Sequence, residues 1–319
     1  MDRLFAIGVF LCATLLQSFS PLPARAQEIL LATGADRVYH ETGRALCRLV
    51  TRQVEDIRCT ALQTESADFN LSNVSGGALE MAIVPADLHY HAVKGSGPFA
   101  FTDIPYDTLR SLFSLQVEAF TVMARRDSGI QAFVELEGHR VNIGNPRSRQ
   151  RALMELAMNA MGWVKGDFQL VDELPLAQQS LALCHNRVQA IPYVVAHPNE
   201  TVAQTLGLCE GRLLAIRHPE IDKAIAQAPY FVPVTIPGGL YEGSSAVSTF
   251  GLRATLVSSS DVSAELVEKI VTAVFENLDR LRTIHPVLAR LQPERMVREG
   301  LTAPLHEGAL RYYRSRGWM

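Results

Sequence analysis

The sequence has no large excess of charge and, beyond its first residues, no long hydrophobic run. A formal net charge of −3 over 319 residues argues against binding nucleic acid through a broad basic face. No later segment reaches the roughly 18 uninterrupted apolar residues that indicate a membrane-spanning helix. With 48% hydrophobic and 20% charged residues, the chain is typical of a globular protein. Its length favours two lobes over one.

The common motifs of catalytic and cofactor sites are also missing. We find no phosphate-binding loop, no GxGxxG fingerprint and no GxSxG nucleophile elbow. His40 and Glu41 begin an HExxH pattern, but Arg44 stands where the second histidine belongs. No Cys-x-x-Cys pair or closely spaced Cys/His quartet offers a metal site. We therefore expect no cofactor, no metal and no enzymatic activity; a secreted hydrolase is the weakest alternative, because no nucleophile with a nearby base can be named.

The first 26 residues are typical of a secretory signal peptide. A short charged start precedes the apolar run Leu4–Leu16, which is shorter than the ~20 residues of a membrane span. Ala24-Arg25-Ala26 fits the small-x-small cleavage pattern. An uncleaved anchor is the alternative, and interruptions such as Pro21 and Pro23 count against it. We expect a mature chain that begins near Gln27 and resides in the periplasm.

Removal of that segment takes Cys12 away and leaves four cysteines, an even number in an oxidising compartment. The four can pair in three ways. Proximity in the sequence favours Cys47 with Cys59 and Cys184 with Cys209, each joining a helix to a nearby strand or loop. Four buried free thiols are the alternative.

The mature chain alternates β-rich apolar runs with helical patterns in two blocks, which is typical of α/β lobes. In the first block we expect strands at 28–32, 57–62 and 81–84 and helices at 42–54 and 67–75. In the second we expect strands at 140–143, 168–171 and 188–195 and helices at 150–161, 176–183 and 201–206.

Two further strand-like segments, Phe113–Arg125 and Thr249–Ser258, have the composition of passages between lobes. They predict lobe I from residues 27–119 and 247–319 and lobe II from residues 120–246, with hinges near 117–124 and 246–252. The last element is expected to be one long helix, capped by Asp261 or Ser263 and stopped by Pro286. Its apolar stripe comprises Leu266, Ile270, Val274, Leu278 and Leu281.

The loop Gly144–Arg151 is the most informative polar segment. It concentrates Arg147, Arg149 and Arg151 at the start of a predicted helix, where free backbone amides already favour an anion. Arginine also matches a carboxylate with two parallel hydrogen bonds. The loop therefore predicts an anion site, and the alternative is a solvated basic turn.

The chain resembles the TAXI class of periplasmic solute-binding proteins, the substrate receptors of TRAP transporters. The resemblance runs from Thr33 to the C-terminus and is carried by these segments: Thr33-Gly34 through Tyr39, Thr42-Gly43, residues 45–50, Ile57-Arg58-Cys59, Asp87 with Tyr90-His91-Ala92, 125–130, Pro146 with Ser148, Ala196-His197-Pro198, 275–279, and 304–309 with Tyr312-Tyr313. It implies a type II periplasmic-binding fold, with two α/β lobes, a ligand cleft between them and two crossover strands. It also supports both disulfides.

The departures from the family pattern fall in the loops that would line the cleft. Family glycines near the ligand are replaced by side chains at 35–37, 65–66 and 147–150, and Pro85-Ala86-Asp87 stands where Gln-Ser-Asp is usual. The expected binding residues are Thr33, Gly34, Arg37, Tyr39, Thr64, Ser66, Asp87, Asn145, Arg147, Ser148, Arg149, Tyr193 and His197. In this set Arg37 faces Arg147 and Arg149 from the other lobe, and Tyr39 or Tyr193 supplies an apolar wall.

These features predict a monomeric extracytoplasmic receptor that binds a small carboxylate or amino acid and delivers it to TRAP-type permease subunits. If Asp36 and Glu65 point inward, they favour a zwitterion; if these two residues pair with the arginines instead, the cleft neutralises itself. The second hypothesis is therefore a periplasmic sensor or accessory protein with an altered or empty cleft that signals through a membrane partner.

Overall fold

A computed structural model describes residues 26–102 and 106–319. The predicted signal peptide lies outside the described residues, except for Ala26. No helix within the described ranges combines the length and apolarity that a membrane crossing requires.

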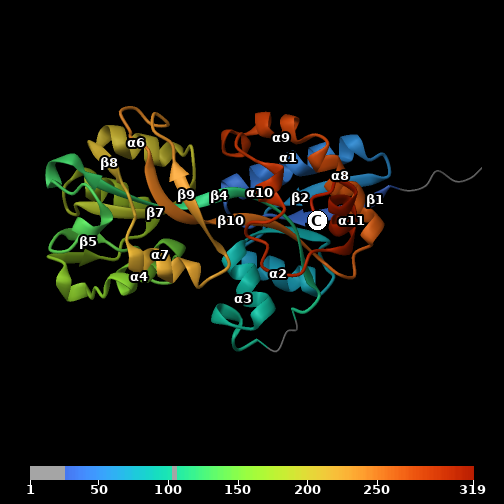
Figure 1. The fold of residues 1–319 in the computed structure, drawn as a ribbon, viewed down its shortest axis with the longest axis horizontal. Helices are drawn as coiled ribbons and strands as arrows, with labels where there is room; N and C mark the ends of the chain where they lie inside the picture. Colours follow the sequence, from blue (N-terminus) through green and yellow to red (C-terminus); the bar gives the residue numbers. More distant parts are fainter. Residues whose placement is uncertain (1–25, 103–105) are drawn as a thin grey trace, which may run out of the picture.

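The described strands form one ten-stranded sheet that is shared by two lobes (Figure 1). Its main order is β2-β1-β3-β10-β4-β7-β5-β6, with β8 on β4 and β9 on β10. The strands are β1 (Gln27–Ala32), β2 (Ile57–Leu62), β3 (Met81–Pro85), β4 (Leu109–Arg125), β5 (Arg140–Asn142), β6 (Leu170–Asp172), β7 (Ala190–Ala196), β8 (Gly211–Leu214), β9 (Phe231–Ile236) and β10 (Val247–Ser259).

Helices pack around both ends of this sheet. Lobe I carries α1 (Arg37–Gln53), α2 (Ala67–Ser75), α3 (Ala86–Lys94), α8 (Ala264–Phe275), α9 (Leu278–Ile284), α10 (Pro293–Met296) and α11 (Glu307–Ser315). Lobe II carries α4 (Arg149–Met161), α5 (Leu176–Cys184), α6 (Glu200–Leu208) and α7 (Pro219–Ala226). Short 3-10 turns lie at Gly97–Phe99, Arg126–Ser128, Phe133–Glu135, Lys165–Asp167 and Pro286–Leu288.

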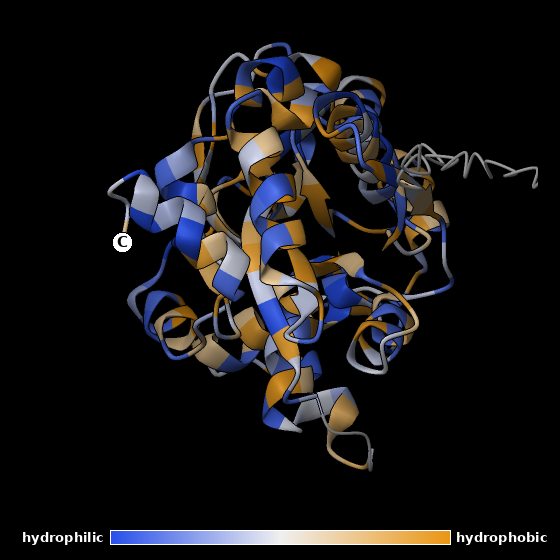
Figure 2. Cartoon of the chain, turned by 90° about the vertical axis from the view of Figure 1, so that its right-hand side faces the viewer, coloured by the Kyte–Doolittle hydropathy of each residue, from blue (hydrophilic) through white to orange (hydrophobic). Residues whose placement is uncertain are grey.

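Each lobe buries its own apolar residues. Figure 2 looks onto the lobe I end and shows helices with alternating hydrophilic and hydrophobic turns. In lobe I the core joins β1 and β3 to α1, α8 and α11, and Phe113 packs edge-on against Phe275. In lobe II, the rings of Phe120 on β4 and Phe250 on the neighbouring strand β10 pack together with their centroids 5.3 Å apart.

Strands β4 and β10 pass through both lobes. The first part of β4 pairs with the last part of β10 in lobe I, and residues 118–125 pair with β7 and β8 in lobe II. The two strands approach closely at Gly251, where an added Cβ would lie 2.4 Å from the carbonyl oxygen of Glu118. This arrangement confirms the predicted type II periplasmic-binding fold with two crossover strands.

The structure confirms both favoured disulfides: Cys47–Cys59 joins α1 to β2, and Cys184–Cys209 joins the last residue of α5 to the residue that follows α6. The prediction of one long helix after Ser263 is wrong. Ser263 caps α8 as expected, but the helix breaks at Glu276 and Asn277, and α9 begins at Leu278. The Asn277 side chain donates to the carbonyl oxygen of Ala273, so it competes with the backbone bonds that would continue the helix.

Candidate functional site

Arg149 links the two lobes at the crossover. It is the first residue of α4 in lobe II, and Ser148 caps that helix by accepting from the Arg151 amide. Its Nη1 donates to Glu118 Oε2 on β4 at 2.6 Å, and its Nε lies 4.0 Å from Asp87 Oδ2 on α3 of lobe I. One guanidinium therefore connects a crossover strand with elements of both lobes.

The Glu118 carboxylate at the centre of this site is largely withdrawn from water. Its side chain is 9% exposed, and it also accepts from the Tyr39 hydroxyl of α1 at 3.1 Å. Burial raises the pKa of Glu118 to about 7, although Arg149 acts in the opposite direction. Burial and the Glu118 carboxylate raise the pKa of Tyr39 well above its ordinary value, so Tyr39 remains a neutral donor.

The site holds two carboxyl groups and one guanidinium. Burial works against the charge of Arg149, but Glu118 and Asp87 raise its pKa above the ordinary value. The guanidinium therefore stays charged. When Glu118 is ionised, the two carboxylates outnumber the guanidinium, so the side chains of the site carry a net negative charge.

An aromatic contact joins the lobes beside this ion pair. Tyr230, between α7 and β9 of lobe II, lies with its ring centroid 5.3 Å from Tyr90 and 5.6 Å from His91 on α3 of lobe I. The lobes thus touch through both charged and aromatic side chains.

His197 organises the loop after β7. The Thr121 hydroxyl lies 2.8 Å from His197 Nε2 and donates to the carbonyl oxygen of Ala119. On the other side of the ring, the Tyr241 hydroxyl lies 2.6 Å from His197 Nδ1 and accepts from the Asn199 amide. These partners fit a neutral ring that donates from Nε2 and accepts at Nδ1. Burial lowers the pKa of His197 to about 4, in agreement with that form.

Three expected binding residues have no polar contact with Arg149 or Glu118 in the structure. Arg37 belongs to the first turn of α1 because Asp36 caps that helix; its side chain is 85% exposed and pairs with Glu41. Arg147 is exposed, with a φ of +67°, and the structure gives it no ion pair within the described residues. Tyr193 is buried in lobe II, where its hydroxyl lies 2.6 Å from Ser180 Oγ.

Several neutral residues expected to bind ligand also hold the loops in place. Thr33 Oγ1 donates to the carbonyl oxygen of Leu62. Thr64 Oγ1 accepts from the Gly34 amide and donates to Asn70. Ser66 caps α2, and Ser148 also donates to the carbonyl oxygen of Asn145. Their contribution is a fixed shape at the carboxyl ends of the strands.

Glu118 and Tyr230 were not among the expected residues. Glu118 carries a usable signal, because it is the single acidic residue within the apolar run Phe113–Arg125. Tyr230 carries none, since only the packing of two distant segments brings it to α3. Across residues 26–102 and 106–319, no group of three or more His, Cys, Asp or Glu side chains is placed to hold a metal ion.

Comparison with known proteins gives a family and a fold. The NMT1-like family matches residues 30–317. A TctC solute-binding protein from Polaromonas has a TM-score of 0.55 at 15% identity and covers 93% of this chain and 96% of its own. A putative periplasmic sulfonate-binding protein SsuA from Methylobacillus flagellatus KT has a TM-score of 0.51 at 13% identity, and the periplasmic aliphatic sulphonate-binding protein SsuA from Escherichia coli has 0.50 at 11%. Both cover 92% of this chain and 88% of their own.

Proposed function

The chain belongs to the NMT1-like family, and from that premise we propose that it is an extracytoplasmic solute receptor that binds one small ligand between its lobes. The observation that supports this proposal is the position of Arg149. It projects from the helix N-terminus of one lobe to a buried carboxylate on the crossover strand and toward the other lobe. A ligand at that point touches both lobes and favours their closure.

The charges of the site favour a carboxylate ligand that also carries an ammonium group, such as an amino acid. The ligand carboxylate replaces Glu118 as the partner of Arg149, and the ammonium takes the place of the guanidinium beside Glu118 or Asp87. Tyr39 then donates to whichever carboxylate lies nearest. A simple monocarboxylate is the second choice, and the names of the structural neighbours add sulfonates to the compounds worth testing.

Receptors of this kind work with a membrane partner. The resemblance to TAXI proteins supports delivery to a TRAP-type permease by a monomeric periplasmic receptor. We place the hinges near residues 117–124 and 246–252, with lobe boundaries at 119/120 and 246/247. Co-purification of the tagged chain with TRAP membrane subunits tests this partner, and recovery with a membrane sensor instead argues for the second function below.

One observation favours a second function. Arg149 of lobe II pairs with Glu118 on the crossover strand and lies 4.0 Å from Asp87 of lobe I, so the chain's own side chains form a bridge between the lobes. A receptor-derived accessory protein or sensor that keeps this bridge and signals through a membrane partner needs no solute at all.

A ligand screen separates the two functions. The melting temperature of the mature protein is measured in the presence of amino acids, carboxylates and sulfonates. A ligand raises the melting temperature of its receptor because only the folded state binds the ligand. A shift with one compound class supports the receptor. No shift across the three classes favours the accessory protein.

A further inference from the structure

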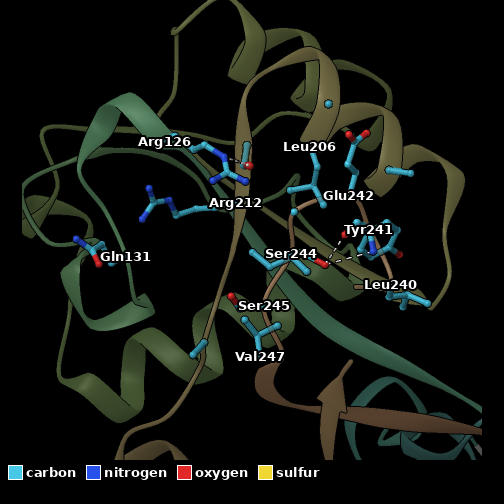
Figure 3. Close-up of a pocket in the computed structure, with 16 residues that line it drawn as sticks. Arg126, Gln131, Leu206, Arg212, Leu240, Tyr241, Glu242, Ser244, Ser245 and Val247 are labelled. Atoms are coloured by element: carbon cyan, nitrogen blue, oxygen red, sulfur yellow. Dashed lines mark hydrogen bonds between the residues drawn. The ribbon is translucent and has the colours of Figure 1, made fainter. Parts of the chain in front are cut away.

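A cavity lies in lobe II, away from Arg149 and the contact between the lobes. It has a volume of about 680 Å³, within the range of ~300 to 1,000 Å³ that is typical of small-molecule sites. Helix α6, strand β8, the segment after β4 and the loop 240–247 form its walls. Figure 3 shows Arg126, Arg212 and Gln131 on one side of the view and Leu206, Leu240 and Tyr241 on the other.

Two arginines in this cavity have no carboxylate partner within the described residues. Arg126 donates from Nε to the carbonyl oxygen of Gly211 at 3.1 Å, which fixes the guanidinium at the cavity wall. Arg212 has a buried Nε without a hydrogen-bond partner. Arg126 is exposed and Arg212 is half-buried, whereas the more deeply buried Arg151 and Arg253 are paired with Glu173 and Glu299. An anion in the cavity would supply the negative partner that both guanidinium groups lack.

The opposite wall is held in place by a tight turn. The Tyr241 amide donates to Ser244 Oγ, and that hydroxyl donates back to the Tyr241 carbonyl oxygen. The Tyr241 hydroxyl is anchored by the Asn199 amide and His197. The wall is therefore preformed, and it offers the exposed Ser245 together with the apolar surface of Leu206 and Leu240.

We propose that this cavity is a second binding site, which takes a small organic anion through Arg126 and Arg212 and packs a short apolar body against Leu206 and Leu240. The head group is a sulfonate, carboxylate or phosphate. Glu242 also lines the cavity and opposes the two guanidinium charges in part. The site is independent of the interlobe site and of the function proposed for it.

The test uses the full mature protein, with 1-butanesulfonate and sodium sulfate as probes and sodium chloride at equal ionic strength as the reference. Amide NMR spectra follow Gly207, Gly211 and Gly243 at the cavity. We expect saturable shifts with both anions and tighter binding of butanesulfonate, because its chain meets the apolar wall. Arg126→Gln and Arg212→Gln should each weaken binding about 10-fold to 150-fold, the loss of one charge-assisted hydrogen bond. Glu242→Gln should tighten it.

Matched variants make the outcome decisive. Arg187→Gln changes an exposed arginine of the same lobe, and Arg149→Gln changes the interlobe site; both should leave binding in the cavity unchanged. Ser245→Trp should abolish binding by filling the cavity while both arginines remain, which covers the case of an arginine variant that fails to fold. No saturable shift in wild-type protein, or equal binding in the Arg126, Arg212 and Ser245 variants, overturns the proposal.

Discussion

Replacing Arg149 with alanine should open the two lobes rather than unfold either of them. The substitution removes the guanidinium that lies 2.6 Å from Glu118 and leaves a carboxylate of 9% side-chain exposure with only Tyr39 as a partner. In the open state water reaches Glu118. The closed state alone therefore carries the cost of burying an unpaired carboxylate.

The size of the effect follows from the charges. Two unit charges about 4 Å apart interact by about 4 kcal/mol at an effective dielectric constant of about 20. Arg149 is 27% exposed, so solvent screening reduces this to about 2 kcal/mol. That energy shifts the ratio of closed to open molecules about 30-fold. Burial raises the Glu118 pKa, and loss of Arg149 removes a group that lowers it, so the closed form of Arg149→Ala is favoured while Glu118 is protonated and is lost as the pH rises through the pKa of Glu118 in the variant.

Spin labels at Lys94→Cys in lobe I and Gln227→Cys in lobe II report the distance between the lobes, because both positions are exposed. We expect longer distances in Arg149→Ala at pH 8 than at pH 5, and recovery of the short distance in Arg149→Ala/Glu118→Gln, where no charge is left unpaired. Arg147→Ala is the matched control, since that side chain is exposed. Identical distance distributions in wild type and Arg149→Ala would refute the proposed bridge.

Three further predictions concern stability. Replacing Cys184 and Cys209 by serine removes the disulfide between two residues that are 25 positions apart, and urea titrations should show lobe II destabilised by about 3.5 kcal/mol. An unchanged urea midpoint argues against this disulfide. Burial lowers the pKa of His89 to about 3 and of His197 to about 4, below their ordinary 6.5, so the unfolded chain binds protons that the folded chain does not. Glu118, with its pKa raised to about 7, offsets one of these two histidines over the same range, so stability should still fall as the pH drops from 6.5 to 4, and a flat urea-midpoint profile contradicts this. Gly251→Ala should lower the melting temperature and destabilise the fold by about 1 to 3 kcal/mol, because the added Cβ would lie 2.4 Å from the Glu118 carbonyl oxygen. Gly166→Ala is the control, since no atom beyond its immediate chain neighbours lies within 4 Å of its added Cβ, and equal melting temperatures of the two variants would contradict the prediction.

The sequence predicted most of the elements because their patterns are local. Residues 57–62 and 67–75 have the expected bounds, because a β-rich run and a helical pattern can be recognised without the rest of the chain. The break at Asn277 was missed because the apolar stripe continues across it and both Leu278 and Leu281 are buried.

The site depends on contacts that sequence spacing does not reveal. Arg149 was included because it starts a helix, a local feature. Its partner Glu118 is 31 residues away, on a strand whose pairing sets which side chains face α4. Arg147 and Arg149 look equivalent in the sequence, but the helix begins at Arg149, and Arg147 remains on the exposed turn before it.

Calorimetric titration of the mature protein is the most direct test of whether the interlobe site binds a solute. The titrant is the amino acid or carboxylate that raises the melting temperature of the protein. We expect one ligand per chain, and binding about 10-fold to 150-fold weaker in Arg149→Gln, the loss of a charge-assisted hydrogen bond. Arg147→Gln should bind as wild type does. Equal affinity in wild type and Arg149→Gln, or no heat of binding from any amino acid, carboxylate or sulfonate, would contradict the receptor function at this site.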